Sequence, residues 1–431
     1  MKVLPHRRII YWIKNDQRIH DNEALHLIAN ADTILPVYII DPTIENKKVT
    51  YYLMESEITF NRIGDKRKKF VFESLLNLQQ EYKNINSKLF IYEGDTATIL
   101  EKIALEMQAD AIVTEEEITE EEIKLIQKVA KKCNLPVILY TGKFLYHPED
   151  IPFHIDKIPD VYTEFRKKVE RVTKVRPVYA TPTALPNVTE INSIEQWNTT
   201  LEINSLDVYK GGEKYGLERL KYYLFDSQLI QHYKYTRNGL LGLDYSSKFS
   251  LWLANGNLSP RTIFYAIEEF EEKINANEST YWLIFELIWR DYFKYISSKY
   301  GTKFFHKGGI KGLAPYYKNS IFLLYDWLDG TTNQPFVNAN MKELAATGYM
   351  SNRGRQNVAS YLCKDLKIDW RIGASYFEMM LIDYDPCSNW GNWMYIAGVG
   401  NDPREDRYFN IPKQAAMYDS NGEYVKYWLN K

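Results

Sequence analysis

The chain has 431 residues, of which 45% are hydrophobic and 15% aromatic, and it carries a formal net charge of -2 with a pI near 6.4. This balance excludes a general electrostatic attraction to nucleic acid or to anionic membranes, so DNA binding would require a local basic patch. No run of about 18 apolar residues and no secretory apolar region occurs, which favours a cytoplasmic protein that does not enter the membrane.

The aromatic content favours an aromatic-lined site for a ligand or a nucleic acid, although a compositional bias would also explain the 34 tyrosines. Three cysteines, Cys133, Cys363 and Cys387, lie far apart and form no CxxC pair. They are too few for a four-cysteine zinc or iron–sulfur site, so no metal centre is predicted and all three are expected to be reduced core residues.

Residues 1–141 predict an α/β domain. Short β-branched runs at 9–13, 33–40, 88–94, 111–114 and 136–140 alternate with amphipathic segments, which is typical of a parallel sheet covered by helices. The GxGxxG turn of a dinucleotide-binding Rossmann unit is missing from the sequence, so NAD or FAD is not expected at the first βα turn. A glutamate-rich run at 115–122 is predicted where a strand meets a helix, and its simplest interpretation is a solvated helix cap.

Residues 142–208 are rich in proline and weakly periodic, which predicts a long surface connection. From 209 to 431 the strand signals disappear and helical periodicity dominates. The sequence therefore predicts an N-terminal α/β domain, a linker, and an all-helical C-terminal domain that is large enough to fold on its own.

Three segments of the helical half carry residues suited to ligand binding. In the first, 245–250, three serine hydroxyls and Lys248 precede an apolar helix. Hydroxyls, backbone N–H groups and one cation at a helix start would suit a pyrophosphate. An ordinary helix N-cap is the alternative interpretation.

The second segment is an amphipathic helix expected over 281–295. Trp282, Glu286, Trp289 and Phe293 follow at helical spacing and share one face. A carboxylate on an apolar face needs a partner, and Arg290 is within reach on the next turn. The alternative is a structural Glu–Arg pair inside a packed helix.

The third segment, 348–412, places polar groups in an aromatic region. Two sets share a helix face each: Asn352, Arg355 and Gln356, and then Asp385, Asn389 and Trp393. Buried charges persist only when they are paired or hydrogen-bonded, so this mixture suggests a large, planar, charged ligand with Asp383 and Asp385 as acceptors. Trp370 and Trp393 would alternatively be core residues.

These residues resemble a known family. Ordered blocks along nearly the whole chain resemble the cryptochrome/photolyase flavoproteins, and within them the cryptochrome-DASH branch. The blocks are RIIYWIKNDQRIHDNEAL, LPVYIIDP, PDVYTEFRKKVE, YKYTRNGLLGLDYSSKFSLWLANGNLSPR, ELIWRDYF, SNRGRQNVASYL, KDLKIDWR, LIDYDPCSNWGNW and VGNDPREDRYFN.

The resemblance implies FAD bound noncovalently in the helical domain. The residues that match the family's cofactor-binding positions are Tyr233, Ser246, Ser247, Lys248, Phe249, Ser250, Trp282, Arg290, Asn352, Arg355, Asp383, Asp385 and Asn389. Among them, the stretch 246–250 matches the phosphate site, an Arg355–Asp383 ion pair is expected beside the flavin ring, and Asn389 matches the position that faces flavin N5.

The resemblance also implies a pocket for a pyrimidine dimer. Its matching residues are Glu286, Trp289, Gln356, Tyr395, Arg237 and Arg353. Glu286 would hydrogen-bond the dimer where charge develops on it. Because such a pocket must receive bases removed from the stack, single-stranded DNA is the expected substrate, with RNA as a further candidate.

The sequence departs from the family pattern at several places. Trp393 and Trp370 match the first two members of an electron-transfer chain of three tryptophans, but the third position falls on Tyr317, with Trp327 further along. The family's Val-Asp-Ala-Asn block reads Val-Asn-Ala-Asn at 337–340. Glu117 matches the contact to an antenna, which is expected to be a folate, methenyltetrahydrofolate.

The resulting hypothesis is a monomeric deoxyribodipyrimidine photo-lyase. Reduced FAD would supply the electron that splits cyclobutane pyrimidine dimers, preferably in single-stranded DNA. One rival is a blue-light receptor of the cryptochrome type that binds nucleic acid without efficient repair. Another is a light-independent flavin electron carrier, which the Glu286 and Trp289 face disfavours because a carrier needs no lesion-shaped pocket.

Overall fold

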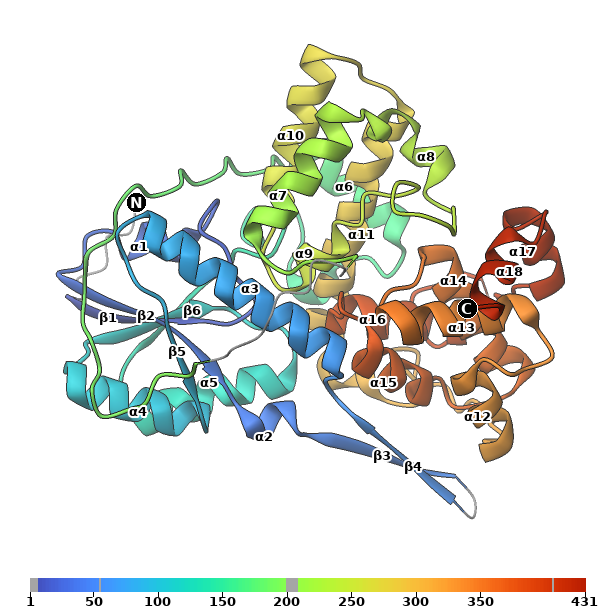
Figure 1. Ribbon diagram of the computed structural model, residues 1–431, viewed down its shortest axis with the longest axis horizontal. Helices are drawn as coiled ribbons and strands as arrows, with labels where there is room; N and C mark the ends of the chain where they lie inside the picture. Colours follow the sequence, from blue (N-terminus) through green and yellow to red (C-terminus); the bar gives the residue numbers. More distant parts are fainter. Residues whose placement is uncertain (1–6, 54–55, 199–207, 405–406) are drawn as a thin grey trace.

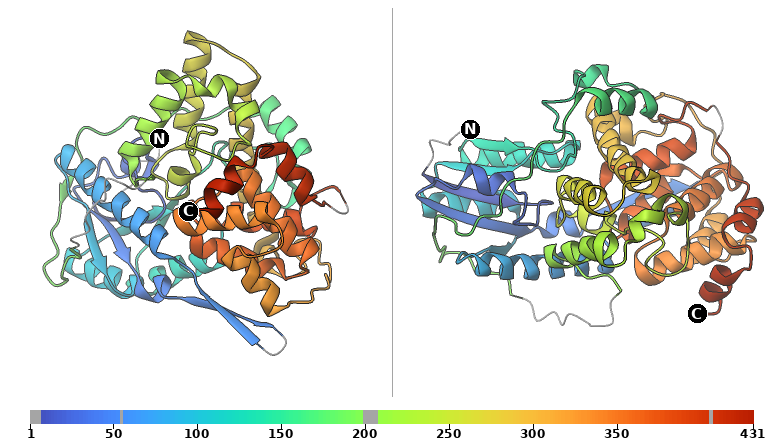
Figure 2. Two further views of the ribbon diagram at one scale, coloured as in Figure 1. Left: turned by 45° about the vertical axis from the view of Figure 1, so that its right-hand side comes forward. Right: turned by 90° about the horizontal axis from the view of Figure 1, so that it is seen from above.

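The computed structural model describes residues 7–53, 56–198, 208–404 and 407–431. It places an α/β domain beside a helical domain (Figure 1), and both further views keep the two domains next to each other (Figure 2). The predicted fold class, a parallel-sheet domain followed by a helical domain, is confirmed.

The α/β domain is built on a parallel sheet with the strand order β5-β2-β1-β6-β7. Its strands are β1 (Arg8–Ile13), β2 (Thr33–Ile40), β5 (Phe90–Glu93), β6 (Ala111–Glu115) and β7 (Val137–Tyr140). The helices are α1 (Glu23–Leu27), α2 (Pro42–Glu45), α3 (Asp65–Asn84), α4 (Thr96–Met107) and α5 (Glu120–Cys133). All five predicted strands are present at the predicted places.

The two faces of the sheet are covered by different helices. Ile9, Tyr11 and Ile13 pack toward α1 and α3, while Ile10 and Trp12 pack toward α4 and α5. Because successive side chains of a strand point to opposite faces, β1 is apolar throughout, as a strand covered on both sides must be.

Two strands were not predicted from the sequence pattern. β3 (Lys48–Leu53) and β4 (Ser56–Asn61) form an antiparallel hairpin, which projects from the α/β domain toward α12 (Ile321–Asp329) and α15 (Trp370–Met380) of the helical domain (Figure 1). Tyr51 in this hairpin bonds to the Ser375 hydroxyl through oxygens 2.8 Å apart. Most of the hairpin residues are exposed or only partly buried, so neither strand resembles the buried apolar strands of the parallel sheet.

The segment 142–208, predicted as a long surface connection, contains regular structure within its described residues. Helix α6 (Tyr162–Val172) buries Tyr162, Phe165 and Val169, and β8 (Asn187–Val188) adds to the sheet beside β2. Because α6 packs on the long helix α11 (Glu278–Tyr300), this part of the segment is packed against the helical domain.

The helical domain surrounds α11. Its other helices are α7 (Glu213–Lys221), α8 (Tyr233–Thr236), α9 (Ser250–Ala254), α10 (Pro260–Lys273), α12 (Ile321–Asp329), α13 (Pro335–Thr347), α14 (Asn352–Ser360), α15 (Trp370–Met380), α16 (Pro386–Ala397), α17 (Ile411–Tyr418) and α18 (Glu423–Leu429). Short turns of other helical types connect them: η1 (Ile155–Lys157), η2 (Tyr222–Asp226), η3 (Leu229–His232), η4 (Gly301–Phe305) and η5 (Tyr361–Asp365). None of the helices in the described part of the chain is both long and apolar enough to cross a membrane.

Close packing fixes α16 between α11 and α15. A Cβ added at Gly391 would lie 2.3 Å from the Phe293 ring, and one added at Gly373 would lie 2.3 Å from the Trp393 ring. Contacts this short tolerate no side chain, so the two glycines let the helices approach closely enough to enclose a site.

Buried polar groups hold the two domains together. Asp21 accepts two hydrogen bonds from the Arg261 guanidinium, at 3.0 and 2.6 Å, and both side chains are almost completely buried. Glu213 at the start of α7 accepts from the backbone N–H groups of Ile19 and His20. These bonds fix the orientation of the helical domain against the sheet.

Candidate functional site

A cavity of about 290 Å³ lies inside the helical domain. It is enclosed by the chain before α9 and by α11, α14, α15 and α16. Most of the residues predicted to bind a cofactor line this cavity: Tyr233, Ser246, Ser247, Lys248, Phe249, Ser250, Arg290, Asn352, Arg355, Asp383, Asp385 and Asn389. The helical spacing of 352, 355 and 356 and of 385, 389 and 393 therefore directs each set to the same cavity.

Lys248 is the least satisfied of the groups in this cavity wall. Its side chain is buried, and its Nζ has no hydrogen-bond partner among the described residues. Nζ instead lies 3.4 Å from the centre of the Tyr245 ring and 4.4 Å from that of Tyr349. Burial lowers the pKa of Lys248 to about 6, against the opposing effect of Glu343. A buried amine without a hydrogen-bond partner beside three serines fits the anionic diphosphate of FAD, which would favour its protonated form.

Asp383 joins two other walls of the cavity. Arg355 of α14 donates to both of its carboxylate oxygens, at 3.0 and 2.8 Å, and the Ser250 hydroxyl donates at 2.7 Å. The predicted Arg355–Asp383 ion pair is therefore confirmed. Both bonds come from Nη2 of Arg355. The ion pair holds a cation and an anion at one place in the wall, where a flavin ring with polar edges would find both a donor and an acceptor.

Asp385 caps α16 and is ionised by a partner that the sequence pattern did not reveal. It accepts from the Ser388 N–H at 2.7 Å and pairs with the buried Lys294 of α11. Burial alone would raise the pKa of Asp385, but Lys294 and Arg290 outweigh it and hold the pKa well below its usual range. One turn further along, the Asn389 amide donates to the Ala374 carbonyl at 3.0 Å, which fixes its oxygen and nitrogen in position.

The predicted lesion side shares the same cavity. Glu286 and Gln356 both line it, and Arg237, which also lines it, forms an ion pair with Glu286. The Glu286–Arg290 pair considered from the sequence does not form, because Arg290 donates to the carbonyls of Lys143 and Leu253 at 2.6 and 3.1 Å. Burial raises the pKa of Glu286, and Arg237 opposes that shift.

Four of the predicted residues lie outside the cavity wall. Trp289 stacks on Tyr162 with ring centres 3.6 Å apart and meets the Tyr395 ring edge-on at 6.0 Å. Arg353 donates to Gln356 at 2.8 Å and to Asn238 at 3.1 Å. Trp282 lies beneath Lys234 and Arg237. Arg353 and Trp282 therefore adjoin the lesion side through Gln356 and Arg237, which line the cavity. Trp289 and Tyr395 pack against each other outside the wall.

Tyr162 was not among the predicted site residues. It comes from α6, in the segment predicted as a connection, and its hydroxyl donates to the Phe285 carbonyl at 2.8 Å. Tyr162 belongs to the block PDVYTEFRKKVE, which resembles the family pattern. The sequence alone nevertheless gives no reason to place this block against α11.

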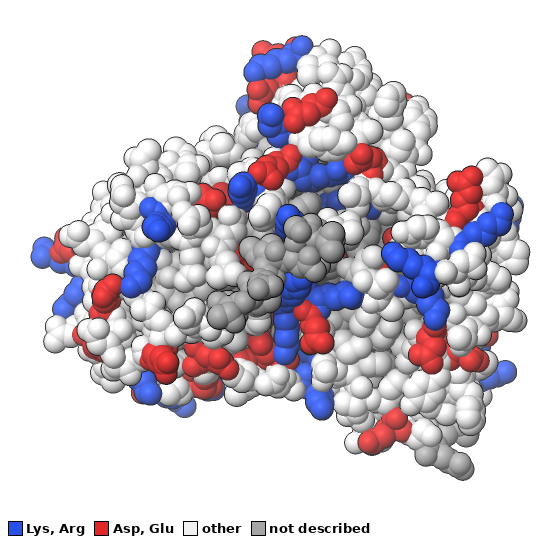
Figure 3. Space-filling model, in the orientation of Figure 1, with Lys and Arg blue, Asp and Glu red and all other residues white. Residues whose placement is uncertain are grey.

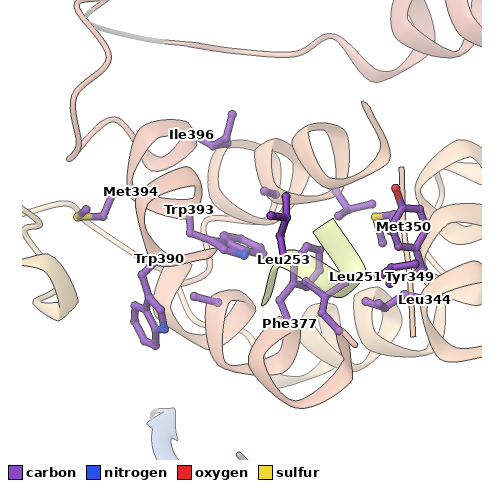
Figure 4. Close-up of a cluster of buried hydrophobic side chains, with 14 of the residues drawn as sticks. Leu251, Leu253, Leu344, Tyr349, Met350, Phe377, Trp390, Trp393, Met394 and Ile396 are labelled. Atoms are coloured by element: carbon purple, nitrogen blue, oxygen red, sulfur yellow. The ribbon is translucent and has the colours of Figure 1, made fainter. Parts of the chain in front are cut away.

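An aromatic cluster leads away from the cavity. Trp393 lines the cavity and points toward Leu253 and Phe377, while Trp390 lies on another side of α16 (Figure 4). Trp370 is fully buried and meets the Trp390 ring at 5.5 Å. Trp327 is also fully buried and meets the Trp393 ring at 6.3 Å. Since Tyr317 is only half-buried, it is the better placed of the two candidates for the outer end of an electron chain.

A second cavity, of about 650 Å³, lies between the two domains. Glu117 lines it and is ion-paired with Lys14 and Lys143, each at 2.8 Å. Burial would raise the pKa of Glu117, but these two lysines hold it at about 2. The interpretation of the glutamate run as a solvated cap is wrong for Glu115 and Glu117, which are buried.

The chain was compared with known families and proteins. Residues 9–187 match the family described as DNA photolyase, and residues 282–431 match the FAD binding domain of DNA photolyase. A cryptochrome DASH of Xenopus laevis is 44% identical over 99% of this chain and 83% of its own length. A cryptochrome DASH of Synechocystis sp. is 42% identical over 98% of this chain and 87% of its own length.

Solved structures agree with these matches. The crystal structure of a Synechocystis cryptochrome superposes with a TM-score of 0.91 at 40% identity, covering 100% of this chain and 90% of that one. A Sulfolobus tokodaii photolyase that holds two FAD molecules superposes with a TM-score of 0.78 at 26% identity, covering 98% and 90%. The chain therefore belongs to the cryptochrome/photolyase family, in its cryptochrome-DASH branch, and carries the FAD-binding domain of that family.

Proposed function

We propose that this protein is a light-driven lyase that splits cyclobutane pyrimidine dimers, preferably in single-stranded DNA. The single observation that supports this most strongly is that Glu286 and Gln356 line the same cavity as Arg355, Asp383 and Asn389. A substrate in contact with Glu286 would thus share an enclosed space with the cofactor. Reduced FAD, when bound, supplies light absorption and the electron that opens the cyclobutane ring and then returns.

The residues of the chain bind, orient and exclude water. Glu286 would hydrogen-bond the dimer at the carbonyl region where negative charge develops. Arg237, held by Glu286 in this structure, would be released to a phosphate or a base when the dimer enters. Trp289, fixed from behind by Tyr162, would present an aromatic wall to an unstacked pyrimidine.

Single-stranded DNA is favoured by the cost of extruding the dimer, which is least where the bases are already unpaired. On the face shown in Figure 3, basic and acidic side chains are interspersed. Local cations at the lesion side, Arg237, Arg353 and Arg407, would hold the few phosphates that flank a flipped dimer.

The second cavity supports a folate antenna such as methenyltetrahydrofolate. The Asn255 side-chain amide lines this cavity and its Nδ2 has no hydrogen-bond partner among the described residues, which fits the acceptor atoms of a pterin ring. Lys47, Arg62 and Lys68 line the same cavity and would attract the carboxylates of a folate tail. Release of a pterin with the spectrum of a folate from heated protein would test this assignment.

Repair of a thymine-dimer oligonucleotide under near-UV light tests the main proposal. The reduced holoprotein should repair single strands faster than duplexes, and Glu286→Ala should retain FAD yet lose about tenfold or more in repair yield. Glu272→Ala, at an exposed glutamate of α10, is the matched control and should repair normally. Light-dependent reduction of FAD without any repair would instead favour the blue-light receptor.

A further inference from the structure

The surface around Tyr317 is basic and aromatic. Residues 301–325 contain four lysines and one histidine but not a single Asp or Glu, in a chain whose net charge is -2. Lys307 and Lys318 are exposed, and so is Lys367, whose carbonyl accepts hydrogen bonds from the Lys318 and Asn319 N–H groups. None of the three lysines has a carboxylate within ion-pair distance among the described residues.

Exposed aromatic side chains lie on the same surface. Tyr316 is 78% exposed, Phe322 is 79% exposed, and Tyr52 at the end of β3 is 80% exposed. A hollow of about 420 Å³ separates the β3–β4 hairpin from α15, and Lys307, Asn319, Asp369 and Arg371 line it together with Tyr52. Large exposed apolar groups next to unpaired charges are typical of a surface that another protein covers.

Tyr317 connects this surface to the interior. Its ring lies beneath the Lys307 ammonium, 5.2 Å away, and its hydroxyl has no hydrogen-bond partner among the described residues. Asp369 and Arg371 act electrostatically on the phenol, so Tyr317 lies near the start of α15. Lys307, Asp369 and Arg371 also line the hollow, so Tyr317 lies close behind its wall.

We propose that this surface, defined by Tyr52, Lys307, Tyr316, Lys318, Phe322 and Lys367, docks an acidic one-electron carrier protein that reduces Tyr317. The inference rests on the bound FAD of the proposed function and on the electron-transfer chain that the family resemblance implies, in which light draws an electron through Trp393 and Trp370. Tyr317 would then have lost one electron and its hydroxyl proton. One electron from the carrier and one proton from water restore the phenol, and the carrier is oxidised by one electron.

Two features favour a protein partner over a small reductant. A small thiol needs neither three unpaired lysines nor three aromatic rings that are mostly exposed. Complementary charge accelerates the encounter of two proteins and makes it sensitive to salt, whereas reduction by a neutral thiol depends little on surface charge.

The experiment measures light-driven reduction of FAD in the holoprotein with two donors, reduced flavodoxin and dithiothreitol. Flavodoxin is used because it is an acidic carrier that transfers single electrons. The double variant Lys318→Glu with Lys367→Glu should lose at least tenfold in rate with flavodoxin and stay within twofold with dithiothreitol. Raising the salt concentration from low to about 0.5 M should abolish the advantage of flavodoxin over dithiothreitol in the unmodified protein. The rate of FAD reduction in a parallel sample kept in the dark is subtracted, because it measures direct reduction of FAD by the donor.

Binding of oxidised flavodoxin, measured by calorimetry, gives a readout that does not depend on photochemistry and should weaken in the same variant. The matched control is Lys83→Glu with Lys131→Glu, at exposed lysines of α3 and α5, and it should change neither quantity. The proposal would be overturned if the two double variants lost the same fraction of the flavodoxin rate. It would also be overturned if Lys318→Glu with Lys367→Glu lowered the rates with flavodoxin and with dithiothreitol equally. So would loss of single-stranded DNA binding with an unchanged flavodoxin rate, which would make the surface a nucleic-acid platform. An absence of dimer repair would contradict the proposed function but not this inference, because the assay contains no lesion.

Discussion

At the scale of single residues, the cavity is held together by charges that each have an identified partner, with Lys248 as the exception. Arg355, Ser250 and Asp383 form one closed set of bonds, and Lys294 and Asp385 form another. A buried charge without a partner is costly. Neutralising one member of either set should therefore strongly weaken the binding of FAD in the cavity.

Asp383→Asn should lower the occupancy of FAD. The change removes the ion pair to Arg355 and leaves a buried guanidinium with one acceptor fewer. Hydrogen bonds to charged groups contribute about 1.5–3 kcal/mol, so FAD affinity should fall by roughly tenfold to a hundredfold. The ratio of flavin absorbance to protein absorbance after dialysis measures it, with Glu272→Gln as the control that should keep full occupancy.

Lys248 predicts that binding of FAD takes up a proton. In the folded chain burial lowers the pKa of Lys248 to about 6, whereas an unfolded lysine titrates near about 10.4. Between these values the unfolded chain binds one proton more, so the flavin-free protein should gain stability as pH rises, by up to about 1.4 kcal/mol per pH unit. Glu343, Arg219, Arg355 and Asp383 act on the same group.

An anionic diphosphate favours the protonated amine, so FAD affinity should fall as pH rises above about 6. Calorimetric titration at pH 7.5 in two buffers of different ionisation enthalpy measures the proton uptake. Lys248→Met should bind FAD more weakly and without that proton. Proton uptake that persists in the methionine variant would assign it to another group, with Glu343 as the first to examine because burial raises its pKa to about 7.

At the scale of secondary-structure elements, α15 and α16 place the aromatic residues. Gly373 lets α15 lie directly on the Trp393 ring, and the Trp370 Nε1 donates to the Lys307 carbonyl at 3.0 Å. The same two helices thus hold the inner tryptophan against the cavity and the outer one against the basic segment 301–325.

Trp393→Phe should nearly abolish reduction of oxidised FAD by an external thiol under blue light, because Trp393 lines the cavity and the route starts there. Tyr317→Phe should slow the reaction and remove a tyrosyl-radical signal in transient spectra. Trp327→Phe should have a smaller effect than either, since Trp327 is buried behind Trp393 and does not reach solvent.

Each of these variants should repair dimers normally after chemical reduction, because the catalytic electron passes only between the cofactor and the lesion. A fall in that repair would contradict the separation of the two pathways. If Trp327→Phe severely slowed the light-driven reduction of FAD while Tyr317→Phe left it normal, Tyr317 would not be the outer end of the electron-transfer chain.

At the scale of the whole molecule, the buried pair Asp21–Arg261 joins the two domains. Arg261→Met should destabilise the protein by about 3–5 kcal/mol, because Asp21 is left as a buried charge without its main partner. Urea unfolding followed by circular dichroism, compared at the midpoint, measures the loss. Adding Asp21→Asn to this variant should restore part of the stability.

The control is Lys273→Met, which removes an exposed ion pair on α10 and should leave the midpoint unchanged. An unchanged midpoint for Arg261→Met would mean that the Ser259 hydroxyl and the Tyr179 N–H satisfy the Asp21 carboxylate without the guanidinium. Because the chain has two domains, a loss of cooperativity in Arg261→Met is a further expected sign that the interface has opened.

The sequence by itself determined the class of the fold, the five strands of the parallel sheet and most of the polar residues that line the cavity in the helical domain. Hydrophobic periodicity reports which residues face a core, and helical spacing brings 352, 355 and 356 or 385, 389 and 393 to one side. Tertiary structure alone decided which charges pair. Glu286 meets Arg237 rather than Arg290, and Asp385 meets Lys294, because partners far apart in sequence depend on how α8, α11 and α16 pack. Tertiary structure also decided that α6 and the β3–β4 hairpin pack against the helical domain. Their partners there are far away in the sequence, so a local sequence pattern cannot predict these contacts.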